Sequence, residues 1–255
     1  MPWDPQIYEE FKNVRYQPFY DLMAMIRSDH HQHAIDLGCG TGEQTAILSE
    51  KFGKTNFIGV DSSVEMLEHS SRLAHARLHF IHATTEDILR TGEQWDLIFS
   101  NAALQWSDHH HILFPLLLQR LNTGGEFAVQ MPVQPENILN RLLFELIQEE
   151  PFYSQLKGWK RESPLLSIDE YTQLLFDGGL ENLSIIQKVY PIIAPDHETL
   201  YNFIAGSALI PYMDRLDEEQ RKKFAYTFKQ RIAAHFTKLP AIYAFKRLLL
   251  YGRKP

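Results

Sequence analysis

The fold is decided by the sequence IDLGCGTGEQT, which occupies residues 35–45. An apolar run that contains Asp36 passes directly into three glycines at alternate positions, Gly38, Gly40 and Gly42, and an amphipathic pattern follows over residues 43–52. A strand that turns sharply into a helix needs backbone with positive φ, and a nucleotide-like ligand needs backbone that it can approach closely. Glycine meets both needs. We therefore predict a strand, a ligand-binding loop and a helix, in that order.

The spacing of these glycines separates the loop from the dinucleotide fingerprint. That fingerprint is Gly-x-Gly-x-x-Gly, whereas here the third glycine comes one residue earlier and an acidic residue precedes the first. A second apolar run, over residues 55–60, ends in Asp61, roughly 20 residues beyond the loop, where the doubly wound fold places the acid that binds ribose hydroxyls. Asp61 is therefore a candidate ligand residue. The alternative is that Asp61, Ser62 or Ser63 caps the helix predicted over residues 64–73.

Strand-like runs and helical patterns alternate along the first half of the chain. Further strands are predicted over residues 78–82, 95–101 and 125–131, with a helix over 110–121 before the last of them. Alternation at this spacing implies parallel βαβ units, so we expect a doubly wound, Rossmann-like α/β sheet. Ligands of such sheets bind at the carboxyl ends of the strands, where the strand order reverses.

We expect three segments along the chain. Residues 1–30 would form an N-terminal lid of two short helices, over 5–11 and 18–26, with a break between them, and residues 31–132 would form the cofactor-binding core. Residues 133–255 would add the last two strands of a seven-stranded sheet, over 183–193 and 242–252. The remaining patterns predict a loop at 151–164 and helices over 136–149, 167–177, 196–207 and 217–236. Two helical insertions among them would form a cap over the substrate.

Composition limits the classes of function. The net charge of −7 argues against a nucleic-acid partner, because phosphate binding draws on clusters of Lys and Arg. The compact basic groups, Arg221-Lys222-Lys223 and Lys246-Arg247, are expected on solvated faces of a helix and a strand. No apolar run approaches the roughly 20 residues of a membrane span, and the N-terminus lacks the pattern of a signal peptide. We expect a cytoplasmic protein, without a membrane partner, that is a monomer or a weak homo-oligomer.

The single cysteine, Cys39, lies inside the glycine loop. One cysteine cannot form an internal disulfide, which fits a reducing compartment. Because the loop needs a small residue at this position, we favour a small-residue role for Cys39 over a catalytic one.

The glycine loop resembles motif I of the class I S-adenosylmethionine (SAM) methyltransferases. Within that class, the sequences NAALQW at 101–106 and AVQMP at 128–132 are similar to the trans-aconitate 2-methyltransferase family. So are WDP at 3–5, the leucine-proline element at 209–213, and Tyr8, Phe11, Arg15 and Pro18. The resemblance covers nearly the whole chain. It implies SAM as cofactor, S-adenosylhomocysteine as product, and a sheet whose closing strand is antiparallel.

The resemblance also implies which residues bind each part of SAM. The methionine part would lie in the glycine loop, on Asp36, Gly38, Cys39, Gly40 and Gly42. The adenosine and sulfonium would lie against residues that follow the next three strands: Asp61 at the ribose, Ser62 and Met66 beside the adenosine, Thr84, Thr85 and Glu86 near the adenine, and Asn101 and Ala102 under the sulfonium. Thr84 stands where related families often have Asp, which leaves Thr85 or Glu86 for the adenine amine.

The acceptor would be a small acid, held by residues that the family pattern places at the substrate. These candidates are Tyr8, Arg15, Gln105, Trp106 and Gln130. The alternative is core packing for Gln105 and Trp106, and a surface position for Arg15. Two positions depart from the family pattern. Ile210 stands where the family tends to have Arg, and Ile192 lies where a tyrosine-histidine pair is expected. A tricarboxylate is best bound by guanidinium groups, so Arg15 is the favoured carboxylate partner.

Methyl transfer to a carboxylate oxygen would proceed by direct SN2 displacement, with acceptor oxygen, methyl carbon and sulfur in line. A carboxylate is already ionised at neutral pH, so we predict neither a catalytic base nor a metal. His109, His110 and His111 are the exception to consider, because a histidine near Trp106 could deprotonate a hydroxyl or bind a metal. Three consecutive histidines on a helix point in different directions, however, and we expect a solvated helix start.

Three alternatives stay open. The acceptor could be another small-molecule oxygen, nitrogen or carbon, and a hydroxyl acceptor would involve the histidines. A nicotinamide-dependent oxidoreductase could use the same sheet, although the early third glycine speaks against it. The chain could also bind SAM without catalysing a reaction. Fold alone supports all of these, so the prediction depends on the loop, Asp61 and residues 101–106.

Overall fold

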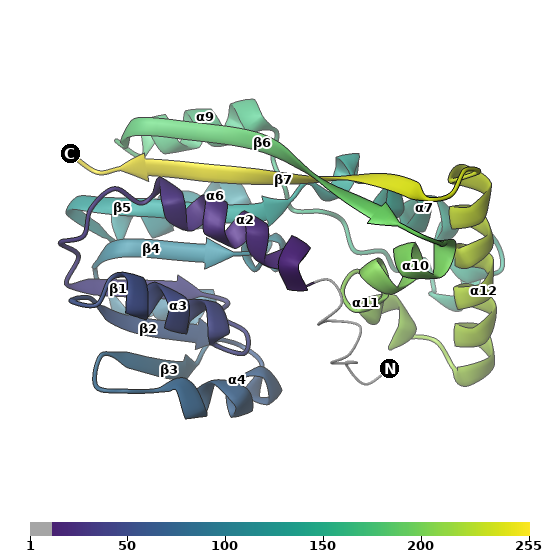
Figure 1. Cartoon of the computed structure of the whole chain (residues 1–255), viewed down its shortest axis with the longest axis horizontal. Coiled ribbons are helices and arrows are strands. Elements are labelled where there is room, and N and C mark those ends of the chain that lie inside the picture. Colours follow the sequence, from purple (N-terminus) through teal and green to yellow (C-terminus); the bar gives the residue numbers. More distant parts are fainter. Residues whose placement is uncertain (1–11) are drawn as a thin grey trace. The chain divides into compact units, whose positions relative to one another are not determined.

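The computed structural model describes residues 12–255, which form two compact units (Figure 1). The first, here called the sheet unit, contains Pro18–Pro132, Pro164–Lys188 and Arg247–Pro255. The second, called the helical unit, contains residues 12–17, Val133–Ser163 and Val189–Lys246. In the described part of the chain, no helix is long and apolar enough to cross a membrane.

A seven-stranded sheet has the order β3-β2-β1-β4-β5-β7-β6. Its strands are β1 His33–Leu37, β2 Asn56–Asp61, β3 Leu78–His82, β4 Trp95–Asn101, β5 Leu121–Pro132, β6 Glu181–Ala194 and β7 Ala241–Arg253. Strands β1 to β5 pair in parallel, and β7 is antiparallel to β5. The predicted doubly wound sheet and its antiparallel closing strand are confirmed. Because β1 pairs with both β2 and β4, the order reverses at β1, which places the ligand-binding crevice at the carboxyl ends of these strands.

Helices cover both faces of the sheet. Those of the sheet unit are α3 Glu43–Lys51, α4 Val64–Ser70, α5 Thr85–Thr91, α6 His110–Gln119 and α9 Ile168–Asp177, together with most of α2 Lys12–Met25 and the short 3-10 turns η1 Ser71–Leu73 and η2 Leu104–Trp106. On one face, Phe19 of α2 and Leu48 of α3 are fully buried against Phe99 and Ala128 of the central strands. Figure 1 shows α2 and α3 lying over this face. On the other, Phe114 of α6 packs on Phe127 of β5, with ring centroids 5.7 Å apart.

The helical unit has its own apolar core. Its helices are α7 Ile138–Leu146, α8 Phe152–Gln155, α10 His197–Ala205, α11 Ile210–Met213 and α12 Glu218–His235, with the 3-10 turn η3 Gln134–Glu136. The fully buried Leu143, Phe224 and Phe228 belong to this core. Residue Ile192, one of the two departures from the family pattern, belongs to it as well and is 3% exposed.

Two predicted boundaries are wrong. We expected a break before a helix that starts at Pro18, but α2 runs without interruption from Lys12 to Met25 with Pro18 inside it. A proline in a helix interior removes one backbone hydrogen bond. Burial of Pro18, Phe19 and Leu22 offsets that loss. The helix predicted over 5–11 lies outside the described residues. The loop predicted over 151–164 contains α8, whose Phe152 is buried in the core of the helical unit.

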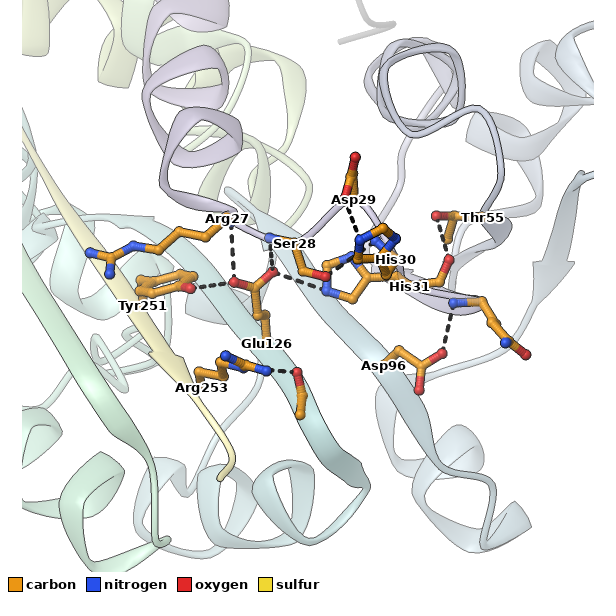
Figure 2. Close-up of polar contacts among 12 residues, drawn as sticks. Arg27, Ser28, Asp29, His30, His31, Thr55, Asp96, Glu126, Tyr251 and Arg253 are labelled. Atoms are coloured by element: carbon orange, nitrogen blue, oxygen red, sulfur yellow. Dashed lines mark hydrogen bonds and ion pairs between the residues drawn. The ribbon is translucent and has the colours of Figure 1, made fainter.

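A buried carboxylate anchors the segment that leads into β1. Glu126 of β5 is inaccessible to solvent and accepts hydrogen bonds from the backbone N–H groups of Arg27, at 3.1 Å, and Ser28, at 3.2 Å. The Tyr251 hydroxyl donates to the same carboxylate, and His31 Nε2 lies 2.9 Å from it. Figure 2 shows both side chains turned toward Glu126. Burial alone would raise the pKa of Glu126, but these hydrogen bonds together hold it below its usual value. The entry into β1, and so the start of the glycine loop, is thereby fixed.

Candidate functional site

The glycine loop takes the conformation that its sequence predicts. Gly38, Gly40 and Gly42 have φ values of +76°, +56° and +80°, a region that disfavours L side chains. A Cβ on Gly42 would lie 2.7 Å from the Phe80 ring and from Ser70, so this position also needs glycine for space. The backbone N–H groups of Gly38 and Cys39 donate to the Val60 carbonyl at 2.7 and 2.9 Å. The loop is therefore tied to the end of β2.

Asp61 connects β2 to the loop. Its Oδ2 accepts a hydrogen bond from the Gly40 N–H at 2.8 Å, and its Oδ1 accepts one from the Ser63 N–H at 2.8 Å. Ser63, rather than Asp61 or Ser62, caps α4, because its side chain accepts from the Met66 N–H. The half-buried Asp61 carboxylate thus lies at the loop with further lone pairs that can accept hydrogen bonds.

The carboxyl group of Asp36, near the end of β1, and the thiol of Cys39, in the loop, are both buried, and burial shifts the pKa of each. Asp36 is 3% exposed, and its Oδ2 accepts a hydrogen bond of 2.6 Å from the Thr45 hydroxyl. Burial raises the pKa of Asp36 to about 7, against the lowering effect of Thr45. Burial also raises the pKa of the Cys39 thiol well above its ordinary value. A protonated, buried thiol is a poor nucleophile, which agrees with a small-residue role for Cys39.

A cleft of about 570 Å³ opens beside the loop at the carboxyl ends of the strands. It is lined by Gly38, Val60, Asp61, Ser62, Ala83, Thr84, Thr85, Glu86, Ala103, Leu104, Trp106, Ser107, Asp108 and His109. This volume falls within the range of cofactor and small-molecule sites. Seven predicted site residues line the cleft: Gly38, Asp61, Ser62, Thr84, Thr85, Glu86 and Trp106. Asp36, Cys39, Gly40, Gly42, Met66, Asn101, Ala102, Gln105 and Gln130 are not among its lining residues.

Thr84 and Asp87 form a capping box at the start of α5. The Thr84 hydroxyl donates to Asp87 Oδ2 at 2.7 Å and accepts from the Asp87 N–H at 3.1 Å. Its side chain is thus engaged in the cap. The neighbours Thr85, half-buried, and Glu86, exposed, have no such role, so they remain the candidates for the adenine amine.

The carboxyl ends of β4 and β5 carry a polar cluster. Asn101 Nδ2 donates to Gln44 Oε1 at 2.9 Å. Ala102 has a φ of +56°, unusual for a residue other than glycine, and is held by Gln130, whose carbonyl accepts its N–H at 2.9 Å. Gln105 Nε2 donates to the Ala102 carbonyl at 2.6 Å. Among the described residues, Asn101 Oδ1, Gln105 Oε1 and Gln130 Nε2 are buried without a hydrogen-bond partner. Buried polar atoms of this kind are candidates for contact with a ligand.

Arg247 of β7 extends this cluster. It is 7% exposed, and its Nη1 donates to Gln130 Oε1 at 3.3 Å. The prediction that Lys246-Arg247 lies on a solvated strand face is wrong for Arg247. Buried and more exposed side chains alternate over residues 241–246 of β7, but residues 247–252 are all buried, so alternation does not single out Arg247.

The three histidines have different environments. His110 is 1% exposed, with Nε2 at 2.9 Å from the Leu104 carbonyl and Nδ1 facing the Tyr171 hydroxyl, so the prediction of a solvated helix start is wrong for it. Packing of α9 on α6 buries this ring. His109 is exposed and lines the cleft, and His111 is exposed with Nε2 at 3.8 Å from Glu170 Oε1. In the described part of the chain, no group of three His, Cys, Asp or Glu residues could hold a metal ion.

Two predicted substrate residues cannot be placed. Tyr8 lies outside the described residues. Arg15 is on α2, but the structure describes only its backbone. Trp106, by contrast, is 40% exposed at the cleft, so it does not serve as core packing.

Comparisons with known proteins give the family. Residues 34–125 match the family model for a methyltransferase domain. The trans-aconitate 2-methyltransferase of Deinococcus radiodurans is 36% identical over 100% of this chain and 99% of its own length. Enzymes of the same name from Acidovorax ebreus and Escherichia coli K12 are 32% and 29% identical, each over 99% of this chain and 98% of their own.

Solved structures share the fold at low identity. The YcgJ protein of Bacillus subtilis has a TM-score of 0.60 at 17% identity, over 94% of this chain and 98% of its own. Phosphoethanolamine N-methyltransferase 2 of Haemonchus contortus, solved in complex with SAM, has a TM-score of 0.58 at 15% identity, over 94% of this chain and 52% of its own.

The residues of the cleft and of the adjoining glycine loop fit SAM. A Cβ on Gly40 would meet no heavy atom within 4 Å, so there is open space above this loop residue. The Asp61 carboxylate lies beside it, and the cleft volume suits a ligand of this size. Family membership also excludes the nicotinamide-dependent oxidoreductase and the non-catalytic module considered above. The chain therefore belongs to the trans-aconitate 2-methyltransferase family of class I methyltransferases and is a SAM-dependent methyltransferase.

Proposed function

We propose that this methyltransferase acts on a carboxylate oxygen of a small polycarboxylic acid, of which trans-aconitate is the first to test. The observation that carries the proposal is Arg247, a buried guanidinium held by Gln130 at the carboxyl end of β5. A guanidinium presents its N–H groups in a planar fork that matches a carboxylate. The name shared by the full-length relatives points to the same class of acceptor.

We also propose roles for the residues of the site. SAM, when bound, supplies a methyl group activated by the positive sulfonium. Asp61 would accept the ribose hydroxyls, and the glycine loop would hold the methionine part. Asn101 would lie under the sulfonium, and Gln105 and Gln130 carry buried polar atoms that would orient the acceptor. A carboxylate oxygen held in line with the methyl group would form its bond to carbon as the carbon–sulfur bond breaks, and the electron pair would go to sulfur. No proton moves, so no base is needed.

Turnover tests the proposal directly. Purified protein should form S-adenosylhomocysteine from SAM only when trans-aconitate is present. Arg247→Ala should raise KM for the acid by about tenfold to a hundredfold, the loss expected for a hydrogen bond to a charged group, while the affinity for SAM stays the same. Arg253→Ala is the matched control, because Arg253 lies on the same strand but is exposed and donates to the Gly124 carbonyl. If the protein binds SAM but forms no S-adenosylhomocysteine with trans-aconitate or with other di- and tricarboxylates, the proposed class of acceptor is wrong.

A hydroxyl acceptor is the second candidate, favoured by His109. This histidine is exposed at the cleft, where it could accept a proton from a hydroxyl. His109→Gln should then abolish turnover with the hydroxyl compound, whereas it should leave the methylation of a carboxylate unchanged.

A further inference from the structure

His110 is the first residue of α6, and its ring is buried. Nε2 lies 2.9 Å from the Leu104 carbonyl oxygen, and Nδ1 is within hydrogen-bond distance of the Tyr171 hydroxyl. Both ring nitrogens are therefore occupied by protein groups. His110 cannot contact a ligand through either of them, unlike its exposed neighbour His109.

The partners determine which nitrogen carries the proton. A carbonyl oxygen can only accept, so Nε2 must be the donor to Leu104. The Tyr171 hydroxyl oxygen already accepts the Leu166 N–H at 3.3 Å, and its own proton can be donated to Nδ1. A neutral ring with its proton on Nε2 satisfies all three contacts. A second proton, on Nδ1, would deprive the buried Tyr171 hydroxyl of its acceptor.

The Leu104 carbonyl belongs to a wall of the cleft. Leu104 begins η2, and Ala103, Leu104 and Trp106 of this segment all line the cleft. The wall follows Ala102, whose positive φ is unfavourable for alanine. Gln105 bonds back to the Ala102 carbonyl from within η2. His110 adds the contact that ties η2 to α9, through Tyr171.

We infer that His110 is a positioning residue of the methyltransferase, which as a neutral imidazole holds the wall Leu104–Trp106 against Tyr171 of α9. The inference rests on the proposed placement of the cofactor in the cleft. Loss of the contact would let η2 move and with it the surface that Ala103, Leu104 and Trp106 present to the ligand.

The charges around His110 agree with a neutral ring. Burial is the largest effect and lowers its pKa, whereas the Leu104 and Ser107 carbonyls and the Asp108 carboxylate oppose it. His111, on the same helix, lowers the pKa further. From α9, Tyr171 contacts the ring, and Glu170 lies near His111. Protonation is thus expected only under acid conditions, where it should disturb the contact with Tyr171.

Binding of S-adenosylhomocysteine, measured by calorimetry between pH 5 and 8, tests this role. His110→Ala and Tyr171→Phe should each weaken binding by about tenfold, as expected for the loss of one buried hydrogen bond. His110→Gln can still donate to Leu104 and accept from Tyr171 but does not titrate. It should retain affinity within about threefold and lack the fall in affinity that the wild type shows in acid. His111→Gln, at the exposed neighbour, should behave as the wild type throughout.

A ¹⁵N spectrum of the histidine rings is a second test, because it reports which ring nitrogen carries the proton. A residue that only filled space would not require one particular tautomer. The resonances that are missing in His110→Gln should show the proton on Nε2 in the wild type and also in Tyr171→Phe, because the Leu104 carbonyl still needs a donor. The ring should take up its second proton at higher pH in Tyr171→Phe, because Nδ1 no longer accepts from the Tyr171 hydroxyl. A proton on Nδ1, or unchanged binding in both His110→Ala and Tyr171→Phe, would overturn the inference. If His110→Ala does not fold, the isosteric Tyr171→Phe decides. Failure of the wild type to bind would instead contradict the proposed site.

Discussion

The Asp61 carboxylate and the Gly40 N–H lie 2.8 Å apart and form a hydrogen bond that joins the end of β2 to the glycine loop of β1. The other carboxylate oxygen accepts the Ser63 N–H, at the cap of α4. One side chain thus holds two backbone segments of the cleft while it keeps lone pairs for a ligand. The acid that follows the second strand therefore shapes the site as well as lining it.

Asp61→Ala should weaken SAM binding by about 1–3 kcal/mol, because the ribose hydroxyls lose a charged partner and the loop loses a tether. Asp61→Asn keeps one oxygen acceptor but no charge, and it should lie between alanine and the wild type. Calorimetry with SAM measures both. Unchanged affinity in Asp61→Ala, with the fold intact by circular dichroism, would contradict the placement of the ribose.

Asp36→Asn should stabilise the ligand-free protein at pH 8 by up to about 4 kcal/mol, since the shift from 3.8 to about 7 spans roughly three pKa units of 1.36 kcal/mol each. The folded-state pKa of about 7 lies above the unfolded value of 3.8, so the contribution of Asp36 to stability is fully present below pH 3.8 and is lost as pH rises through 7. Asparagine can still accept from Thr45 and does not ionise. Thermal unfolding at pH 5 and pH 8 tests this prediction, and an equal or lower midpoint than wild type at pH 8 would contradict it.

Glu126→Gln should destabilise the protein by about 1–3 kcal/mol at pH 7, because the amide nitrogen would face hydrogen-bond donors in a buried position. The pKa of Glu126 is lower in the folded protein than its ordinary value of 4.5. The stability that its charge contributes is thus present above pH 4.5 and is lost as pH falls through the folded pKa. In urea titrations, the difference between wild type and variant should shrink below pH 4.5. Glu93→Gln, at an exposed glutamate, should show no such difference.

The strands of the sheet could be predicted from the sequence because their pattern is local. The predicted strands at 78–82 and 95–101 have the bounds of β3 and β4, and the glycine loop lies between β1 and α3 as expected. Each of these elements is a short apolar run bounded by turn residues. Such a signal does not depend on the rest of the chain.

The burial of single polar residues could not be predicted in the same way. His110 is buried by Tyr171, 61 residues away, and Arg247 is held by Gln130, 117 residues away. Neither position is apolar, so a pattern of hydrophobicity assigns both to the surface. Their environment depends on which elements pack together, and only the fold determines that. Hydrophobic patterns therefore reveal neither the buried guanidinium of Arg247 nor the buried ring of His110.

Gly40→Ala should separate ligand binding from stability. At φ +56° an alanine costs roughly 1–2 kcal/mol, yet its Cβ would meet no protein atom within 4 Å, so the loss of stability should not exceed that strain. If the cofactor occupies the open space above the loop, the alanine Cβ would clash with it. The affinity for SAM should then fall by more than tenfold, which corresponds to a loss of more than about 1.4 kcal/mol of binding free energy.

Gly92→Ala is the matched control for this substitution. Gly92 has φ +81° at the end of α5, and a Cβ there also meets nothing within 4 Å. Gly92 lies outside the glycine loop, however, whereas Gly40 donates its N–H to the cleft residue Asp61. It should lose similar stability and bind SAM as the wild type does. Gly38→Ala would fail for another reason, because its Cβ would lie 2.1 Å from that of Ala103 and disrupt the loop itself. Equal SAM affinities for Gly40→Ala and Gly92→Ala, measured at equal folded fractions, would show that the cofactor does not approach the loop at Gly40.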